Sequence, residues 1–345
     1  LMMIKVLIFD WGDTVMRVFP DYDGPMSNWP QVAGIPGIQA ALSAIKPKYR
    51  LAIATNAADS GEKLVRAALN RLNLEEYFDA VFTAQELGKR KPDPDFFRSV
   101  VDRLEIRPDE AVMIGDDYVA DVVGSKRAGL RAFWYTPQQI ESPSKLPQFD
   151  HRLSDMNTLP ELLGRPFWPD VPQCLTWMRE QGAADGLLKH TEAVGWVAYR
   201  IALKMEKAGI PVDPILAHRG GLLHDLDKIT AAQQGRVHGE LSAELLYAWG
   251  EPVLARIALT HLISRLHDPE NFPVTWEEKL VFYADKIVEG DHVVGVESRL
   301  LALAERYPGF AGEMERAHPG IMDLENEICV ILDLSPKQLI EFLLN

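Results

Sequence analysis

Short runs of apolar residues alternate with amphipathic stretches over the first half of the chain. The runs have the length of buried parallel strands, and the stretches between them have the spacing of helices. The expected strands are Lys5–Phe9, Leu51–Ala54, Ala80–Phe82, Ala111–Ile114 and Arg131–Trp134, and the expected helices include Glu62–Leu72, Asp95–Leu104 and Tyr118–Ala128. This alternation predicts an α/β fold built on a parallel sheet.

The pattern changes after Leu163. Three prolines follow within residues 166–172 and interrupt regular structure, so we expect a linker at 165–173 between domains at 1–164 and 174–345. Beyond the linker, apolar residues recur with the 3.6-residue period of helices, which predicts an all-α second domain. The expected helices are Leu187–Ala208, Pro214–Leu226, Glu240–Trp249, Val253–Leu262, Trp276–Val288 and Glu297–Tyr307.

The charge is acidic and uneven along the chain. Residues 1–165 carry 20 basic and 23 acidic side chains, whereas residues 166–345 carry 16 and 27. Nucleic acids bind through extended basic faces, so this balance argues against a nucleic-acid partner. A small phosphorylated molecule remains compatible with it if metal ions supply local positive charge.

Cysteine content and hydropathy indicate the cellular compartment in which the protein is expected. The two cysteines, Cys174 and Cys329, show no spacing typical of a disulfide framework or a thiolate zinc site. No apolar run approaches the roughly 18 residues that suggest a membrane-spanning helix. We therefore expect a cytoplasmic protein without a membrane partner. The oligomeric state is not predicted.

Histidines and aspartates recur within or beside apolar runs of the second half: His190, His224, Asp225, His238, His261 and Asp285. A polar group that points into a helical core costs several kcal/mol, on the order of 2–7, unless it is paired or binds metal. Imidazoles combined with carboxylates are donors typical of Fe, Mn, Co or Zn, rather than of a site for Ca or Mg built from oxygen alone. The pattern predicts a metal centre.

The second half, from about residue 174 to 345, resembles the HD superfamily of metal-dependent phosphohydrolases. Three segments match in order and spacing: Leu-Leu-His-Asp-Leu-Asp-Lys, Val-His-Gly-Glu-Leu-Ser-Ala-Glu-Leu-Leu and Leu-Val-Phe-Tyr-Ala-Asp-Lys-Ile-Val. The resemblance implies one metal held by His190, His224, Asp225 and Asp285. It implies that His238 and His261 complete a second metal site, with Asp225 bridging, so that the domain holds one or two ions of Fe, Mn, Co or Zn.

Two further polar residues lie near the His-Asp pair. Lys228 follows Asp225 by one helical turn, and the resemblance implies that it lies near the substrate phosphate; the other interpretation is an exposed cation at a helix end. His218 precedes Asp225 by seven residues, but the family pattern has no ligand there. We expect His218 at the edge of the core or on the surface.

Polar residues follow three strands of the first half. Asp10 comes directly after the first strand, Thr55 follows the second, and Asp116 follows the fourth, with Asp121 five residues later. Lys91 lies between Thr55 and Asp116 in the sequence. Ligands of open α/β sheets bind at the carboxyl ends of the strands. Carboxylates, a hydroxyl and an ammonium group are therefore expected at one edge of the sheet.

These motifs, over about residues 3–163, resemble the haloacid dehalogenase superfamily. The resemblance implies that Asp10 is a nucleophile that forms an aspartyl-phosphate, that Thr55 binds the phosphoryl group and that Lys91 neutralises charge. It implies a Mg²⁺ site formed by Asp10, the Gly12 carbonyl, Asp116 and Asp121. A metal and a cation offset the repulsion between a carboxylate and a phosphoryl group.

One departure from that pattern affects the expected activity. The family's phosphatases carry an aspartate two residues after the nucleophile to protonate the leaving group, but this chain has Gly12 there and an aspartate at Asp13. The domain is then either an active phosphatase or a weakened, regulatory one. The residues between Asp10 and Leu51 suffice for one short helix, so we expect a capless Rossmann-like sheet.

The combined pattern predicts a hydrolase of phosphoester or phosphoanhydride bonds. Its substrates are expected to be nucleotides or other small phosphorylated metabolites, cleaved with metal-activated water in the second domain. Two alternatives stay open: a di-iron oxygenase on the HD fold, and a nucleotide-sensing regulatory protein with a degenerate first domain.

Overall fold

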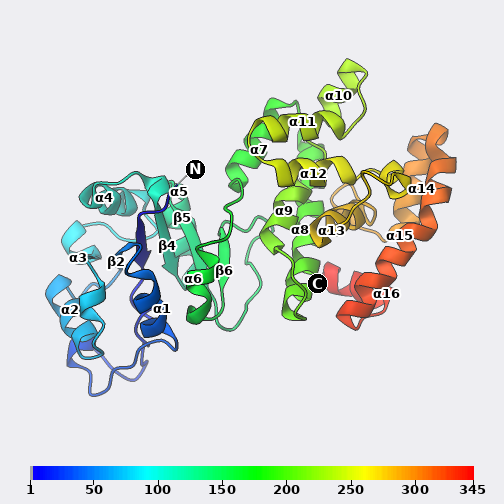
Figure 1. Ribbon diagram of the computed structural model, residues 1–345. Coiled ribbons are helices and arrows are strands. Elements are labelled where there is room, and N and C mark those ends of the chain that lie inside the picture. The colour runs from blue at the N-terminus through cyan, green and yellow to red at the C-terminus, as the bar shows by residue number, and fades with distance from the viewer. Residues whose placement is uncertain (1–2) are drawn as a thin grey trace. The chain divides into compact units, whose positions relative to one another are not determined.

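Figure 1 shows the computed structural model, in which residues 3–345 are described. The chain divides into two compact units. The first contains the described residues up to Ser142 together with Gln148–Phe167, and the second contains Pro143–Pro147 and Trp168–Asn345. The short segment Pro143–Pro147 thus belongs with the second unit, although the residues on either side of it belong to the first.

A six-stranded parallel sheet forms the centre of the first unit, in the order β3-β2-β1-β4-β5-β6. The strands are β1 Val6–Phe9, β2 Arg50–Thr55, β3 Ala80–Thr83, β4 Ala111–Gly115, β5 Arg131–Tyr135 and β6 His151–Leu153. Side chains of β1 alternate between two apolar clusters, with Leu7 in one and Ile8 in the other, so both faces of the sheet are buried. The predicted α/β fold is confirmed.

Helices connect the strands of the first unit (Figure 1): α1 Ile38–Ile45, α2 Glu62–Asn70, α3 Ala84–Leu87, α4 Pro94–Leu104, α5 Gly124–Arg127 and α6 Leu159–Leu162. Only α1 and a single 3₁₀ turn, Met26–Asn28, lie between β1 and β2, which confirms the capless arrangement. The helix expected at Tyr118–Ala128 differs. It begins as a wide π-type turn over Tyr118–Val123, where the Asp117 carboxylate accepts two main-chain N–H groups, and only then becomes α5.

The second unit is helical, as predicted, with one small two-stranded ribbon formed by Val288–Glu289 and His292–Val293. Its helices are α7 Val171–Glu180, α8 Asp185–Lys207, α9 Pro214–Leu223, α10 Lys228–Gln234, α11 Glu240–Ala248, α12 Pro252–Thr260, α13 Trp276–Asp285, α14 Val296–Arg306, α15 Ala311–Leu332 and α16 Pro336–Leu344. Helix α7 begins inside the segment expected to be irregular, because Pro172 lies in its first turn, where no N–H is needed. None of the described helices has the length and apolar character required to cross a bilayer.

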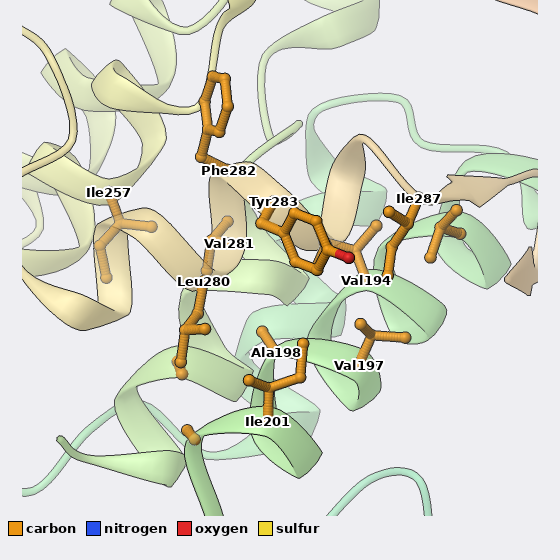
Figure 2. Close-up of a cluster of buried hydrophobic side chains, with 14 of the residues drawn as sticks. Val194, Val197, Ala198, Ile201, Ile257, Leu280, Val281, Phe282, Tyr283 and Ile287 are labelled. Atoms are coloured by element: carbon orange, nitrogen blue, oxygen red, sulfur yellow. The ribbon is translucent and has the colours of Figure 1, made fainter. Parts of the chain in front are cut away.

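The core of the second unit lies between α8, α12 and α13. Figure 2 shows side chains of one buried cluster from these helices: Val194, Val197, Ala198 and Ile201 of α8, Ile257 of α12, and Leu280–Tyr283 of α13, with the Phe282 ring pointing away from the others. Helices α8 and α9 approach each other at Gly195 and Gly221. A Cβ added to Gly221 would lie 2.4 Å from the Gly195 Cα, so glycine is required for this approach.

Candidate metal centres

The six histidines and aspartates predicted in the second half come together within the second unit. They are positioned as follows: His190 in α8, His224 and Asp225 directly after α9, His238 before α11, His261 directly after α12, and Asp285 as the last residue of α13. The carboxylates of Asp225 and Asp285 lie close to the imidazole nitrogens. His190 Nε2 lies 3.1 Å from Asp285 Oδ1, and His238 Nε2 lies 2.6 Å from Asp225 Oδ1. His261 Nε2 lies 3.6 Å from the same Asp225 oxygen.

The other ring nitrogen of each imidazole is bound to an oxygen. In three of them Nδ1 donates to a main-chain carbonyl: His190 to Gly290 (2.8 Å), His224 to Gly221 (2.7 Å) and His261 to Ala258 (2.6 Å). A carbonyl can only accept, so the proton is on Nδ1 and the Nε2 lone pair is left toward the carboxylates. This is the form in which histidine binds metal.

Burial keeps the central imidazoles neutral. It lowers the pKa of His224 to about 3, and it also lowers the pKa of His261. Burial alone would raise the pKa of Asp225, but the ammonium group of Lys228 and the hydrogen bond from His238 hold it well below its usual value. Neutral imidazoles beside an ionised carboxylate form a ready ligand set.

The donor set fits a divalent metal. The buried Nε2 of His224 has no hydrogen-bond partner among the described residues, and an unpaired buried acceptor of this kind costs free energy. Ligand atoms of two groups lie within 4.8 Å of one another: His190, His224 and Asp285 in one, and His224, Asp225 and His261 in the other. His238 lies outside both groups and reaches Asp225. The bridging role of Asp225 stays a prediction.

Asp227 supports the centre and was not predicted from the sequence. Its carboxylate accepts a hydrogen bond from Nδ1 of His238 at 2.6 Å and others from the main-chain N–H groups of Gly239 and Ser242, each at 2.9 Å. An aspartate two residues after the His-Asp pair in an apolar context was the available signal. It orients His238 as Gly221 orients His224.

Lys228 opens helix α10, and its ammonium group pairs with the Asp225 carboxylate while the side chain stays 39% exposed. The N-terminal end of a helix is positive, so the dipole does not favour a cation there. The ion pair with Asp225, and not the helix dipole, therefore explains the position of Lys228. His218, expected at the core edge or surface, is instead fully buried, and its Nε2 donates to the Lys145 carbonyl.

A second cluster lies at the carboxyl edge of the parallel sheet in the first unit. The buried ammonium group of Lys91 is 2.6 Å from Asp10 Oδ1, 2.6 Å from Asp121 Oδ1 and 2.9 Å from the Ala54 carbonyl. Burial would lower the pKa of Lys91, but Asp10 and Asp121 outweigh this effect and raise it. Asn56 holds the Lys91 main chain through two hydrogen bonds. The sheet thus brings predicted residues 81 positions apart into contact.

The carboxylates of this cluster are crowded. Asp10, Asp116 and Asp121 have ligand oxygens within 4.8 Å of one another. Burial, together with the charge of Asp10, raises the pKa of Asp116 to about 6, and burial raises that of Asp121 to about 7. A divalent cation would relieve this repulsion, so the set of oxygens fits Mg²⁺. Thr14, which was not predicted, donates to Asp116 Oδ1 at 3.0 Å.

The turn after Asp10 explains what Asp13 does. Asp13 adopts a left-handed backbone with φ 52°, and its Oδ1 accepts a hydrogen bond from the Val18 N–H at 2.9 Å. Its carboxylate is therefore occupied within the turn. Gly12 has no side chain to offer, and metal binding by its carbonyl stays a prediction. Thr55 ends β2, and its hydroxyl accepts from the Ala57 N–H at 3.2 Å.

Comparison with known families agrees with this geometry. Residues 7–135 match the family described as haloacid dehalogenase-like hydrolase, and residues 187–289 match the HD domain. The two clusters lie on a haloacid dehalogenase-type sheet and on an HD-type helical scaffold. The chain thus joins an N-terminal haloacid dehalogenase-like hydrolase domain to a C-terminal HD domain.

Three curated relatives illustrate the similarity. The ribulose-1,5-bisphosphate 5-phosphatase of Halopiger xanaduensis is 36% identical over 104 residues, covering 28% of this chain and 44% of the relative. The glyceraldehyde 3-phosphate phosphatase of Pyrococcus furiosus is 30% identical over 104 residues, covering 29% and 41%. An uncharacterized protein of Methanocaldococcus jannaschii is 30% identical over 149 residues, covering 40% and 83%. The chain spans less than half the length of the two phosphatases.

Proposed function

We propose that this chain is a phosphohydrolase of small phosphorylated metabolites or nucleotides, with its main metal-dependent site in the HD domain. The observation that carries the proposal is the shared orientation of four imidazoles. Each has Nδ1 bound to an oxygen, and the Nε2 atoms face two carboxylates, with His224 Nε2 buried and unpartnered. One or two ions of Fe, Mn, Co or Zn match these donors.

Each side chain has a part in the reaction. His190, His224 and Asp285 would hold one ion, and Asp225, His238 and His261 would complete the site. A divalent ion held there supplies an activated water and positive charge for hydrolysis. Lys228 pairs with Asp225 and its side chain is partly exposed, so its ammonium group can also bind a phosphoryl oxygen.

The haloacid dehalogenase-like site supports a second phosphatase reaction. Asp10 would attack phosphorus and form an aspartyl-phosphate while the bond to the leaving oxygen breaks. Lys91 lies 2.6 Å from Asp10 and can offset the developing charge, Thr55 can bind the phosphoryl group, and Mg²⁺ held by Asp10, Asp116, Asp121 and the Gly12 carbonyl would reduce repulsion. Two of the relatives are named as phosphatases of phosphorylated compounds, which favours a phosphatase over a sensor. No specific observation favours the oxygenase.

A panel of phosphorylated metabolites and nucleotides, with added Mg²⁺ or Mn²⁺, tests both sites. The full chain is compared with Asp225→Ala and Asp10→Asn, and bound metal is counted in each. We expect Asp225→Ala to lose bound metal and at least one activity, and Asp10→Asn to lose a different one. Full activity of Asp225→Ala on every substrate would refute the main assignment.

A further inference from the structure

A cavity of about 250 Å³ in the HD domain opens beside the proposed metal centre. His190 lines it on one side, and Lys228, Arg299 and Arg306 line it together with Glu289. Three cations therefore line the cavity together with one carboxylate, that of Glu289. This contrasts with the acidic excess of the half of the chain to which the cavity belongs.

The two arginines differ in how far they are engaged. Arg299 is 5% exposed, donates to the main chain of Asp285 at 3.0 Å and to its carboxylate at 3.2 Å, and pairs with Glu289. Its guanidinium group is held in place. Arg306, the last residue of α14, pairs with Glu289 alone among the described residues and is 48% exposed. It keeps donors for a ligand.

The charge of the cavity suits a dianion. Among the side chains that line the cavity, Lys228, Arg299 and Arg306 are cations, and Glu289, which the two arginines share, is the one anion. The other carboxylate partners of Lys228 and Arg299 are Asp225 and Asp285, proposed metal ligands whose charge a divalent ion would offset. Guanidinium groups bind phosphate oxygens through pairs of hydrogen bonds. The volume lies below the roughly 300 Å³ at which pockets for whole ligands begin, so the cavity suits one polar group of a larger molecule.

We propose that this cavity is a subsite for a second phosphate of the substrate, with Arg306 and Lys228 as its binding residues. The HD site then acts on compounds that carry two or more phosphoryl groups, one at the metal centre and one in the cavity. This inference rests on the proposed hydrolase function of the same site. It assigns Arg306 to substrate selection and Arg299 to positioning Glu289.

Binding of non-hydrolysable probes tests the subsite without turnover. Methylenediphosphonate and methylphosphonate are titrated calorimetrically into the Mn²⁺-loaded full chain. We expect the diphosphonate to bind at least about tenfold more tightly, and Arg306→Ala to reduce this ratio to about two or less while Arg306→Lys keeps part of it. A binding event that is the same in the wild type, Arg306→Ala and Arg316→Ala belongs to another site, such as that of the first domain, and is left out of the ratio.

Arg316→Ala is the matched control, because Arg316 is an exposed arginine of α15 in the same unit and does not line the cavity. It should keep the wild-type ratio. A wild-type ratio in Arg306→Ala would overturn the proposal. So would equal affinity of the wild type for both probes.

Kinetics separate this inference from the proposed function. With ADP and AMP as substrates, Arg306→Ala should raise KM for ADP about tenfold, change kcat less than threefold and leave AMP unaffected. A chain that hydrolyses neither, yet loses its diphosphonate preference in Arg306→Ala, would refute hydrolysis and retain the anion subsite. Hydrolysis of both substrates with unaltered KM in Arg306→Ala would refute the subsite and retain hydrolysis.

Discussion

Asp227 and His238 are joined by a hydrogen bond of 2.6 Å that fixes the ring of a proposed metal ligand. We predict that Asp227→Asn weakens Mn²⁺ binding by about 10- to 100-fold, because the neutral amide orients the ring less firmly and turns an NH₂ group toward the N–H groups of Gly239 and Ser242. Calorimetric titration with Mn²⁺ measures the effect. Asp323→Asn, an exposed change on α15, should leave the affinity unchanged, and equal affinities for both variants would contradict the role of Asp227.

The contact of α8 with α9 gives a second prediction. Gly221→Ala places a Cβ 2.4 Å from the Gly195 Cα, so the two helices must separate, at a cost of about 1–3 kcal/mol in the free energy of unfolding. His190 and His224 come from α8 and the end of α9, so Mn²⁺ affinity should fall as well. Urea denaturation and metal titration measure these effects.

Gly312→Ala serves as the control for Gly221→Ala. An added Cβ at Gly312 in α15 meets only the Arg316 side chain, at the ordinary distance of 3.6 Å. Alanine favours a helix by about 1 kcal/mol over glycine, so this variant should be as stable as the wild type or more stable. If both substitutions had the same effect, the close approach of α8 and α9 would not be important for stability.

Arg219 is a buried cation with three acceptors. It donates to the Pro169 carbonyl at 2.8 Å, the Pro147 carbonyl at 3.0 Å and His218 Nδ1 at 2.7 Å. Arg219→Met keeps much of the volume but leaves these acceptors unpaired, so we expect a loss of about 3 kcal/mol or more in unfolding free energy. Hydrogen exchange should also become faster in peptides that cover Pro143–Pro147. Unchanged exchange there would show that the bonds of Arg219 do not hold this segment.

Asp150 gives a prediction for acid stability. Burial would raise its pKa, but Lys126 at 2.9 Å, Arg131 at 2.8 Å and the Ala132 N–H outweigh this and lower it. A depressed folded-state pKa contributes stability above the unfolded value of about 3.9, and this contribution is lost as the pH falls through the folded pKa. Asp150→Asn should therefore cost more stability at pH 7 than near pH 3. Equal costs at both pH values, in thermal unfolding, would contradict this linkage.

Much of the candidate site could be predicted because its polar residues lie in apolar stretches of the sequence. His224 and Asp285 lie in apolar helical runs, where an unpaired polar group costs free energy. An imidazole and a carboxylate at such positions therefore indicated pairing or metal binding. Asp10 and Asp116 follow runs that read clearly as strands, and the parallel sheet then determines that they meet. Hydrophobic periodicity and the place of a residue at the end of an apolar run are properties of the local sequence.

Other features depend on tertiary packing. The role of Asp227 requires the turn that brings Gly239 and Ser242 to its carboxylate, and nothing in the adjacent sequence indicates that turn. Helix α15 was not predicted, and Pro319 lies within it; its buried face against the core, including Ile321, outweighs the interruption. Strand β6 has three residues, too few to show a period.

The carbonyls that orient three of the four imidazoles have a consequence for how this protein can evolve. The orientation of His190, His224 and His261 depends on the path of the main chain at Gly290, Gly221 and Ala258, and no change of side chain removes a main-chain carbonyl. These proposed ligands are thus robust to sequence drift around them, provided that the path of the backbone is kept. His238 depends on the carboxyl group of Asp227, so one substitution can release it. Loss of metal ligation by single mutations should begin at His238.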